Sequence, residues 1–297
     1  MKTLLVGATG LLGPEICQRL TAAGHHVRAL VRPTSDRAKR AALKALGVEL
    51  VEGDLKDAAS LARACAGIQA VISTASSTLS RQQGDSIETV DHHGQLALVE
   101  AARHAGVARF VFVSFRENPD VQFPLTIAKR AVELALESSG MTYTILQASY
   151  FMEVWLTPAL GFDVVNRKVT VYGDGNQLVN WISYRDVARA AAAAVSADTA
   201  RNMVIPVGGP DALSPRDVVR MFEEAGSGAI AIECVPAAAL EAQLNAATDS
   251  LQKTFAGLML QYASGDAIDT TTASLLFPFE RISVRDFVRM QLAGARG

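Results

Sequence analysis

Short apolar segments alternate with amphipathic segments through the first half of the chain. The apolar segments are rich in β-branched residues and apolar on both faces, which is typical of parallel strands covered by helices. Strands are predicted at Thr3–Val6, Val27–Val31, Val48–Val51, Ala70–Ser73, Phe110–Val113 and Thr142–Leu146. Helices are predicted near residues 12–23, 36–46, 58–65, 86–105 and 124–139. Successive β-α units with right-handed crossovers predict an α/β fold with a doubly wound parallel sheet.

A glycine follows each predicted helix and precedes the next strand. Glycine readily adopts the left-handed conformation that ends a helix, so this order supports the assignment of the elements. The glycines are Gly24, Gly47, Gly67, Gly106 and Gly140.

The pattern loosens beyond residue 146, where we expect a smaller, mostly helical lobe. A strand at Leu178–Ile182 and an Ala-rich helix near 184–197 are predicted to return to the main sheet, and a short strand is predicted at Ile230–Val235. The predicted domains are therefore 1–155, to which the segment near 178–208 returns, and 156–297.

Composition and charge narrow the class of protein. Apolar residues make up 49% of the chain and charged residues 20%, which is globular composition, and the net charge is −2. We therefore expect neither nucleic acid nor an anionic membrane as a partner. No segment approaches the roughly 20 apolar residues of a membrane span, and the apolar start of the chain is soon broken by glycines, which favours a buried strand over a signal peptide.

Cysteine and histidine usage bears on compartment and metals. The three cysteines are far apart in sequence, which argues against a disulfide framework and fits a reduced, cytoplasmic environment. The five histidines lack the spacing of metal ligands, so we expect no metal site.

The first predicted strand ends in a glycine-rich loop that opens directly into a helix. Glycines there allow a tight turn and a close approach to a pyrophosphate, which the helix N-terminus attracts. Strand, loop and helix in this order predict a Rossmann-type dinucleotide site. The loop residues expected to contact the nucleotide are Gly7, Thr9, Gly10, Leu11, Leu12 and Gly13.

The end of the second strand indicates which dinucleotide binds. Sites for NAD usually carry an acidic residue there, whereas this chain has Arg32, whose planar guanidinium can bind a 2′-phosphate. NADP(H) is therefore the expected cofactor. Nearby basic residues such as Arg37 and Arg40 fit a solvated helix face. Further contacts are expected at the carboxyl ends of the third and fourth strands, from Asp54, Leu55, Thr74, Ala75 and Ser76.

With these motifs placed, the chain resembles the short-chain dehydrogenase/reductase superfamily, and within it the atypical NmrA-like branch. That branch includes isoflavone-reductase-like enzymes, NADPH:quinone reductases and NADP-sensing regulators. The resemblance covers nearly the whole chain. It rests on Gly7-Ala-Thr-Gly-Leu-Leu-Gly13, Gly53-Asp-Leu55, Ala101-Ala-Arg-His-Ala-Gly-Val107, Phe110-Val-Phe-Val-Ser114 and Trp181-Ile-Ser-Tyr-Arg-Asp-Val-Ala188.

Lys129 is the residue on which a catalytic role depends. From the helical pattern alone it is either an ordinary lysine at a helix shoulder or a charge directed at a ligand. The resemblance places it on the lysine of the superfamily's Tyr-x-x-x-Lys motif, which implies a contact with the nicotinamide ribose. Leu125 stands where the tyrosine would be, so the usual proton donor is missing. Ser114, which ends the fifth strand, is expected to contact the cofactor or to satisfy the strand end.

The remaining chemistry favours an enzyme that reduces a flat apolar acceptor. Hydride transfer needs correct placement rather than a protein acid, so quinones or enones suit a chain without the tyrosine. Tyr150 is either a replacement proton donor or, with Phe151 and Trp155, part of an apolar wall. Two alternatives remain: a non-catalytic NADP(H)-sensing regulator that acts through a protein partner, and a non-redox isomerase or epimerase.

Overall fold

The computed structural model describes residues 1–79, 81–116 and 118–294, and it divides into two units. Unit 1 contains residues 1–115, 124–147 and 187–205, and unit 2 contains residues 116–123, 148–186 and 206–297. The chain thus enters unit 2 at residues 116–123 and again at residue 148, and residues 187–205 return to unit 1.

Unit 1 is built on the predicted doubly wound sheet. Its strands are β1 (Lys2–Val6), β2 (His26–Val31), β3 (Glu49–Glu52), β4 (Ala70–Ser73), β5 (Arg109–Phe115), β6 (Thr142–Ala148) and, partly in unit 2, β9 (Met203–Val207). The strand order is β3-β2-β1-β4-β5-β6-β9, and β1 pairs in parallel with both β2 and β4. The direction of winding therefore reverses between β1 and β4, which is where such sheets bind ligands. The predicted fold class is confirmed.

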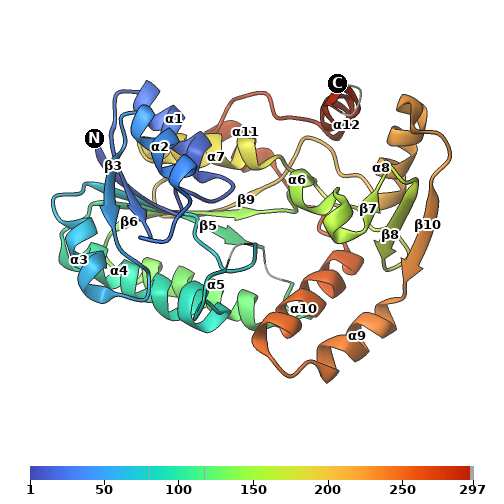
Figure 1. Ribbon diagram of the computed structural model, residues 1–297, viewed down its shortest axis with the longest axis horizontal. Coiled ribbons are helices and arrows are strands. Elements are labelled where there is room, and N and C mark those ends of the chain that lie inside the picture. The colour runs from blue at the N-terminus through green and yellow to red at the C-terminus, as the bar shows by residue number, and fades with distance from the viewer. Residues whose placement is uncertain (80, 117, 295–297) are drawn as a thin grey trace. The chain divides into compact units, whose positions relative to one another are not determined.

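Helices cover both faces of this sheet. They are α1 (Gly13–Ala22), α2 (Arg37–Ala45), α3 (Ala58–Cys65), the π-helix η1 (Ile87–Gly94) that continues into α4 (Gln95–His104), α5 (Pro124–Glu137) and α7 (Tyr184–Ala194). Figure 1 shows α1, α2 and α7 on one face, and α3, α4 and α5 on the other. The glycines predicted to end helices all have left-handed backbones, with φ between 66° and 78°, so those helix ends are confirmed.

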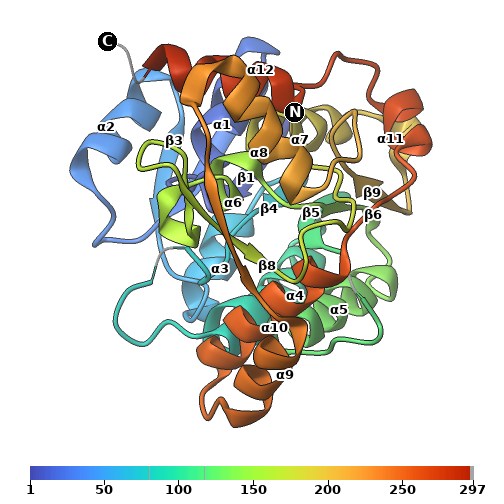
Figure 2. The same ribbon diagram turned by 90° about the vertical axis from the view of Figure 1, so that its right-hand side faces the viewer.

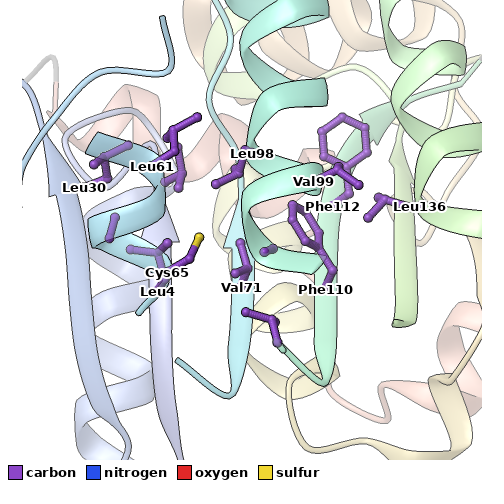
Figure 3. Close-up of a cluster of buried hydrophobic side chains, with 14 of the residues drawn as sticks. Leu4, Leu30, Leu61, Cys65, Val71, Leu98, Val99, Phe110, Phe112 and Leu136 are labelled. Atoms are coloured by element: carbon purple, nitrogen blue, oxygen red, sulfur yellow. The ribbon is translucent and has the colours of Figure 1, made fainter. Parts of the chain in front are cut away.

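The core of unit 1 lies between the sheet and the face covered by α3, α4 and α5. Figure 3 shows Leu61 and Cys65 of α3, Leu98 of α4 and Leu136 of α5 beside buried strand residues such as Phe110. Because strand side chains point alternately to opposite faces, a strand covered on both sides must be apolar throughout. The continuous burial of β4 follows this rule.

The strand predicted at Leu178–Ile182 is not a strand of the main sheet. Val179 forms only isolated bridges, with Leu213 and Asp266, all within unit 2. Residues 179–182 are all buried, so their burial shows no alternation between two faces. The seventh strand is instead β9, which the pattern did not reveal.

Unit 2 combines several helices with a small sheet of order β10-β8-β7, in which β10 corresponds to the strand predicted at Ile230–Val235. The strands are β7 (Phe162–Asp163), β8 (Lys168–Tyr172) and β10 (Ala231–Val235). The helices are α6 (Met152–Trp155), α8 (Pro215–Phe222), α9 (Ala237–Ala246), α10 (Ser250–Ser264), α11 (Thr271–Leu276) and α12 (Val284–Gly294). Figure 2 shows β10 beside β8 and leading into α9, which packs on α10. Within the described residues, no helix has the length and hydropathy to cross a membrane.

Candidate functional site

The glycine loop is packed so closely that side chains are excluded from two of its positions. Gly7 has φ of 94°, and a Cβ there would lie 2.5 Å from Thr74 Oγ1 and 2.9 Å from the Ala75 nitrogen. A Cβ on Gly13 would lie 2.2 Å from the Ala8 carbonyl oxygen. The structure therefore brings the predicted residues of β1 and β4 together at the switch point of the sheet.

Gly10 differs from these two glycines because it is exposed. A Cβ there would meet only the Gly7 carbonyl oxygen, at 3.1 Å. Residue Leu12 precedes α1 without a side-chain cap, so no side chain covers the N–H groups of the first helical turn at that position. An open backbone cradle followed by an uncapped helix N-terminus fits a pyrophosphate. Thr9 and Leu11 are half-buried beside it, and Leu12 is buried.

At the end of β2, Arg32 is paired with a carboxylate. Its Nη1 lies 2.5 Å from Asp85 Oδ2, and Lys56 Nζ contacts the other oxygen, Oδ1. The Asp85 side chain is only 1% exposed, and burial alone would raise its pKa. Hydrogen bonds from Lys56, from the Gln82 amide and from Arg32 outweigh that effect and hold the pKa of Asp85 below its usual value. Asp85 is therefore ionised near neutral pH.

The remaining predicted contacts at the strand ends have partners within unit 1. Asp54 Oδ1 accepts a hydrogen bond from the Lys56 amide at 2.9 Å, so its side chain stabilises the turn after β3. Leu55 is buried in the core cluster. The Ser76 hydroxyl lies 3.1 Å from that of Thr78. Contact of these residues with a nucleotide stays a prediction.

Lys129 is buried on α5, with only 5% of the residue exposed. Its Nζ donates to the Val113 carbonyl at 3.3 Å and lies 4.7 Å from the centre of the Phe112 ring. Burial lowers the pKa of Lys129 below 10.5, while the carboxylates of Asp91 and Glu133 act to raise it. Lys129 is therefore a buried lysine with contacts inside unit 1, and its contact with a nucleotide stays a prediction.

Ser114 belongs to a polar network at the ends of β5 and β6. Its hydroxyl accepts from Arg130 Nη2 at 3.1 Å, and the same nitrogen lies 2.5 Å from Glu133 Oε1. Gln147 Nε2 donates to Glu133 Oε2 at 3.1 Å. Arg130 is therefore a partner for Ser114 at the end of β5, in line with its second predicted role, which is to satisfy the strand end. A cofactor contact is not tested.

Tyr150 lies in an aromatic cluster of unit 2. Its ring meets Trp155 edge-on at 4.7 Å, and Trp155 stacks on Tyr262 at 4.8 Å. Tyr150 is 1% exposed, and burial, Asp266 and Tyr262 together raise the pKa of its hydroxyl well above 10. A phenol with a raised pKa is a weak acid, which favours the apolar-wall interpretation over the proton-donor one.

Three buried carboxylates near these residues were missed by the sequence analysis. Asp85 pairs with Arg32, and Asp91 Oδ2 accepts from the Ser77 amide at 2.9 Å, while its Oδ1 has no hydrogen-bond partner among the described residues. In unit 2, Asp266 Oδ1 lies 3.2 Å from Arg116 Nη1, and burial raises the pKa of Asp266. Isolated acidic residues in loops and helices carry no sequence pattern that marks them as buried. Among the described residues, no cluster could hold a metal ion.

A comparison with known protein families identifies the family of this chain. The NmrA-like family model covers residues 1–275. The chain belongs to the NmrA-like family. The predicted resemblance to this family is thereby confirmed.

Relatives of this chain differ in what they do. It is 32% identical over 243 residues to photosystem II assembly factor Ycf39 of Synechocystis sp., covering 81% of this chain and 72% of that protein. It is 30% identical over 225 residues to the NAD(P)H azoreductase of Xenophilus azovorans, covering 75% and 73%. The family therefore includes oxidoreductases, and membership alone does not choose between reductase and assembly factor.

A solved structure shares the fold over nearly the whole chain. The NADPH complex of the quinone oxidoreductase QOR2 from Escherichia coli has a TM-score of 0.80 and 21% sequence identity, covering 98% of this chain and 99% of that one. That neighbour holds NADPH, and the likeness to it shows that this chain has the same fold. Which residues of this chain contact NADPH is a separate question.

Proposed function

We propose that this protein is an NADPH-dependent reductase that transfers hydride to a flat, apolar acceptor such as a quinone or an enone. The observation that carries the proposal is the buried Lys129, which lies on the same unit as the open glycine cradle. A lysine removed from water has a free-energy cost, so its retention at this position suits a functional charge. The azoreductase and quinone oxidoreductase relatives support the same chemistry.

The cofactor-binding residues follow from the strand ends of unit 1. The backbone of Gly7–Gly13 receives the pyrophosphate, and Arg32 receives the 2′-phosphate. Thr74 and Ala75 lie beside the loop, after the neighbouring strand β4, and Ser76 follows them in sequence. Asp54 and Leu55 flank the adenine end, and Ser114 with Lys129 serves the nicotinamide ribose. NADPH supplies the hydride when bound.

Lys129 has two tasks in this proposal. Its ammonium group donates hydrogen bonds to ribose hydroxyls and fixes the nucleotide. Because the pKa of Lys129 is lowered, it also releases a proton more readily than a lysine in water. That proton, or one from solvent, completes the reduction of a conjugated acceptor. Tyr150 remains the alternative donor, and the aromatic cluster around Trp155 suits a flat substrate.

The deciding experiment measures NADPH consumption by the purified protein with quinones, enones and azo compounds. Lys129→Ala is measured alongside, with Lys44→Ala as a matched control because Lys44 is an exposed lysine of α2. We expect turnover that Lys44→Ala preserves and Lys129→Ala lowers at least tenfold. Turnover unchanged in Lys129→Ala would contradict the proposed role.

A second candidate is an NADP(H)-binding protein that acts through a protein partner without turnover. Two observations favour it: Leu125 replaces the tyrosine of the Tyr-x-x-x-Lys motif, and a relative at 32% identity is described as an assembly factor. Tight NADPH binding with no oxidation by any acceptor in the panel would support this candidate over the reductase. A cytoplasmic location remains an expectation from the sequence.

A further inference from the structure

Two cations in unit 1 converge on one carboxylate at the carboxyl ends of β2 and β3. Arg32 follows β2 and Lys56 follows β3, and each contacts a different oxygen of Asp85. The side chains of Arg32 and Lys56 are 26% and 30% exposed, whereas that of Asp85 is 1% exposed. The carboxylate is thus enclosed by cations that themselves reach solvent.

Asp85 belongs to a short segment that is tied down at this point. The Gln82 amide donates to Asp85 Oδ2 at 2.8 Å, and the Asp85 amide donates to the Gln82 carbonyl at 3.0 Å. A side-chain hydrogen bond of 2.5 Å joins Thr34 Oγ1 to Gln82 Oε1. Gly84 has φ of 80°, a conformation that lets the chain turn immediately before Asp85. Residues 82–85 are therefore fastened to the ends of β2 and β3.

Asp85 is the carboxylate that both cations contact most closely, although Asp54 Oδ2 also lies 3.9 Å from Lys56 Nζ. The neighbouring basic residues are directed elsewhere: Lys39 Nζ donates to the Thr9 carbonyl, and Arg40 pairs with Glu52. A phosphate monoester carries about −1.5 to −2 charges near pH 7. The convergence of Arg32 and Lys56 on one anion therefore suits a phosphate, the group that distinguishes NADP(H) from NAD(H).

We propose that Lys56 joins Arg32 in binding the 2′-phosphate of NADP(H), and that Asp85 is an internal anion that competes with this phosphate for both cations. The proposal rests on the NADP(H) binding put forward above. An ionised carboxylate and a phosphate cannot share the two cations without strong repulsion. Asp85 therefore sets the difference in affinity between NADPH and NADH, and residues 82–85 must shift when the phosphate enters.

The test measures dissociation constants for NADPH and NADH by fluorescence titration of the wild-type protein and three variants. Asp85→Asn removes the competing charge and keeps the shape. We expect it to tighten NADPH about tenfold and to leave NADH within about twofold, the size of one charge-assisted contact. Lys56→Gln should weaken NADPH about tenfold and spare NADH. Glu52→Gln, which breaks the neighbouring pair with Arg40, should change neither.

Each other result overturns a stated part of the proposal. If Asp85→Asn weakens NADH, the carboxylate binds ribose hydroxyls instead of excluding a phosphate. If NADPH affinity does not rise in Asp85→Asn, there is no competition, and if Lys56→Gln leaves NADPH binding intact, Lys56 is not a ligand. Failure of the wild type to bind either dinucleotide would instead refute the proposed function.

A second measurement on the wild type avoids any dependence on folding of the variants. Hydrogen exchange at the Gln82 amide reports its bond to Asp85. We expect 2′,5′-ADP to speed this exchange and 5′-AMP, which lacks the 2′-phosphate, to leave it unchanged. Equal protection with both probes would contradict the displacement of Asp85.

Discussion

The ammonium nitrogen of Lys129 donates a hydrogen bond to the carbonyl of Val113 at 3.3 Å, and both groups lie inside unit 1. Val113 is part of β5, so the lysine of α5 is directed at the carboxyl-terminal half of a central strand. A strand carbonyl can hold one of the three N–H bonds of an ammonium group. The other two N–H groups of the ammonium can donate hydrogen bonds to a ribose hydroxyl or to a nearby carboxylate.

Burial of Lys129 predicts a specific dependence of stability on pH. Since its pKa is lowered below 10.5 in the folded protein, the unfolded chain binds more protons at this group between the folded pKa and about 10.5. The free energy of unfolding contributed by Lys129 therefore rises with pH across that window and is reduced below it. In Lys129→Met the dependence disappears.

Urea unfolding of wild type and Lys129→Met between pH 7 and 10.5 tests this. We expect the stability of the wild type relative to Lys129→Met to rise with pH by up to about 1.4 kcal/mol per pH unit in the window. Parallel stability curves for the two proteins would show that the folded and unfolded pKa values of Lys129 are the same.

Gly10 and Gly13 have different roles that alanine substitution should separate. In Gly13→Ala the new Cβ would lie 2.2 Å from the Ala8 carbonyl oxygen, a backbone atom that cannot move aside easily. We expect a loss of about 3 kcal/mol or more in the free energy of unfolding. In Gly10→Ala the nearest atom is the Gly7 carbonyl oxygen at 3.1 Å, so the fold should survive.

Gly10→Ala should nevertheless weaken nucleotide binding, because the alanine methyl group projects from the exposed backbone of the cradle. We expect NADPH affinity to fall at least tenfold, with the melting temperature close to that of wild type. Thermal melting with and without NADPH measures both quantities. A Gly10→Ala protein that binds NADPH normally would place the pyrophosphate elsewhere.

Whether a strand could be predicted from the sequence depends on how apolar and how continuous its segment is. The six strands β1 to β6 were each predicted within a few residues, because each has a short, mainly apolar segment at its centre. This holds even for β3, which lies at the edge of the sheet and is only partly buried. β9 and β8 were missed because their residues, such as Pro206 in β9, do not form such a run. Leu178–Ile182 was predicted as a strand of the main sheet because it is apolar, yet its partners are isolated positions distant in sequence.

The candidate site shows the same division. The glycine loop and Lys129 were found because their spacing relative to strand and helix carries physical meaning. Asp85 and Asp266 were not, since a single acidic residue in a loop gives no indication that it will be buried against an arginine more than 50 positions away. Such pairings depend on the tertiary fold, which composition and periodicity do not encode locally.

Arg32 should discriminate between the two dinucleotides. Arg32→Gln removes the guanidinium without bringing a second carboxylate close to Asp85, as glutamate would. We expect the dissociation constant for NADPH to rise about 10- to 100-fold, because a charge-assisted contact is lost, and that for NADH to change by less than about twofold. Arg37→Gln serves as the control, since Arg37 is exposed at the start of α2. Equal losses for NADPH and NADH in Arg32→Gln would exclude a phosphate contact.

Substitutions of Tyr150 and Trp155 should show whether Tyr150 is a proton donor or part of an apolar wall. Tyr150→Phe removes only the hydroxyl and keeps the ring against Trp155 and Tyr262. Because the pKa of Tyr150 is raised well above 10, we expect kcat to stay within about threefold of wild type, whereas loss of a general acid would lower it about 100-fold or more. Trp155→Ala should raise KM for the acceptor without a comparable change in NADPH affinity, since it removes stacking surface from unit 2 alone. Steady-state kinetics with the best acceptor of the panel measures both variants. A 100-fold fall of kcat in Tyr150→Phe, with normal KM, would make Tyr150 the replacement for the missing tyrosine.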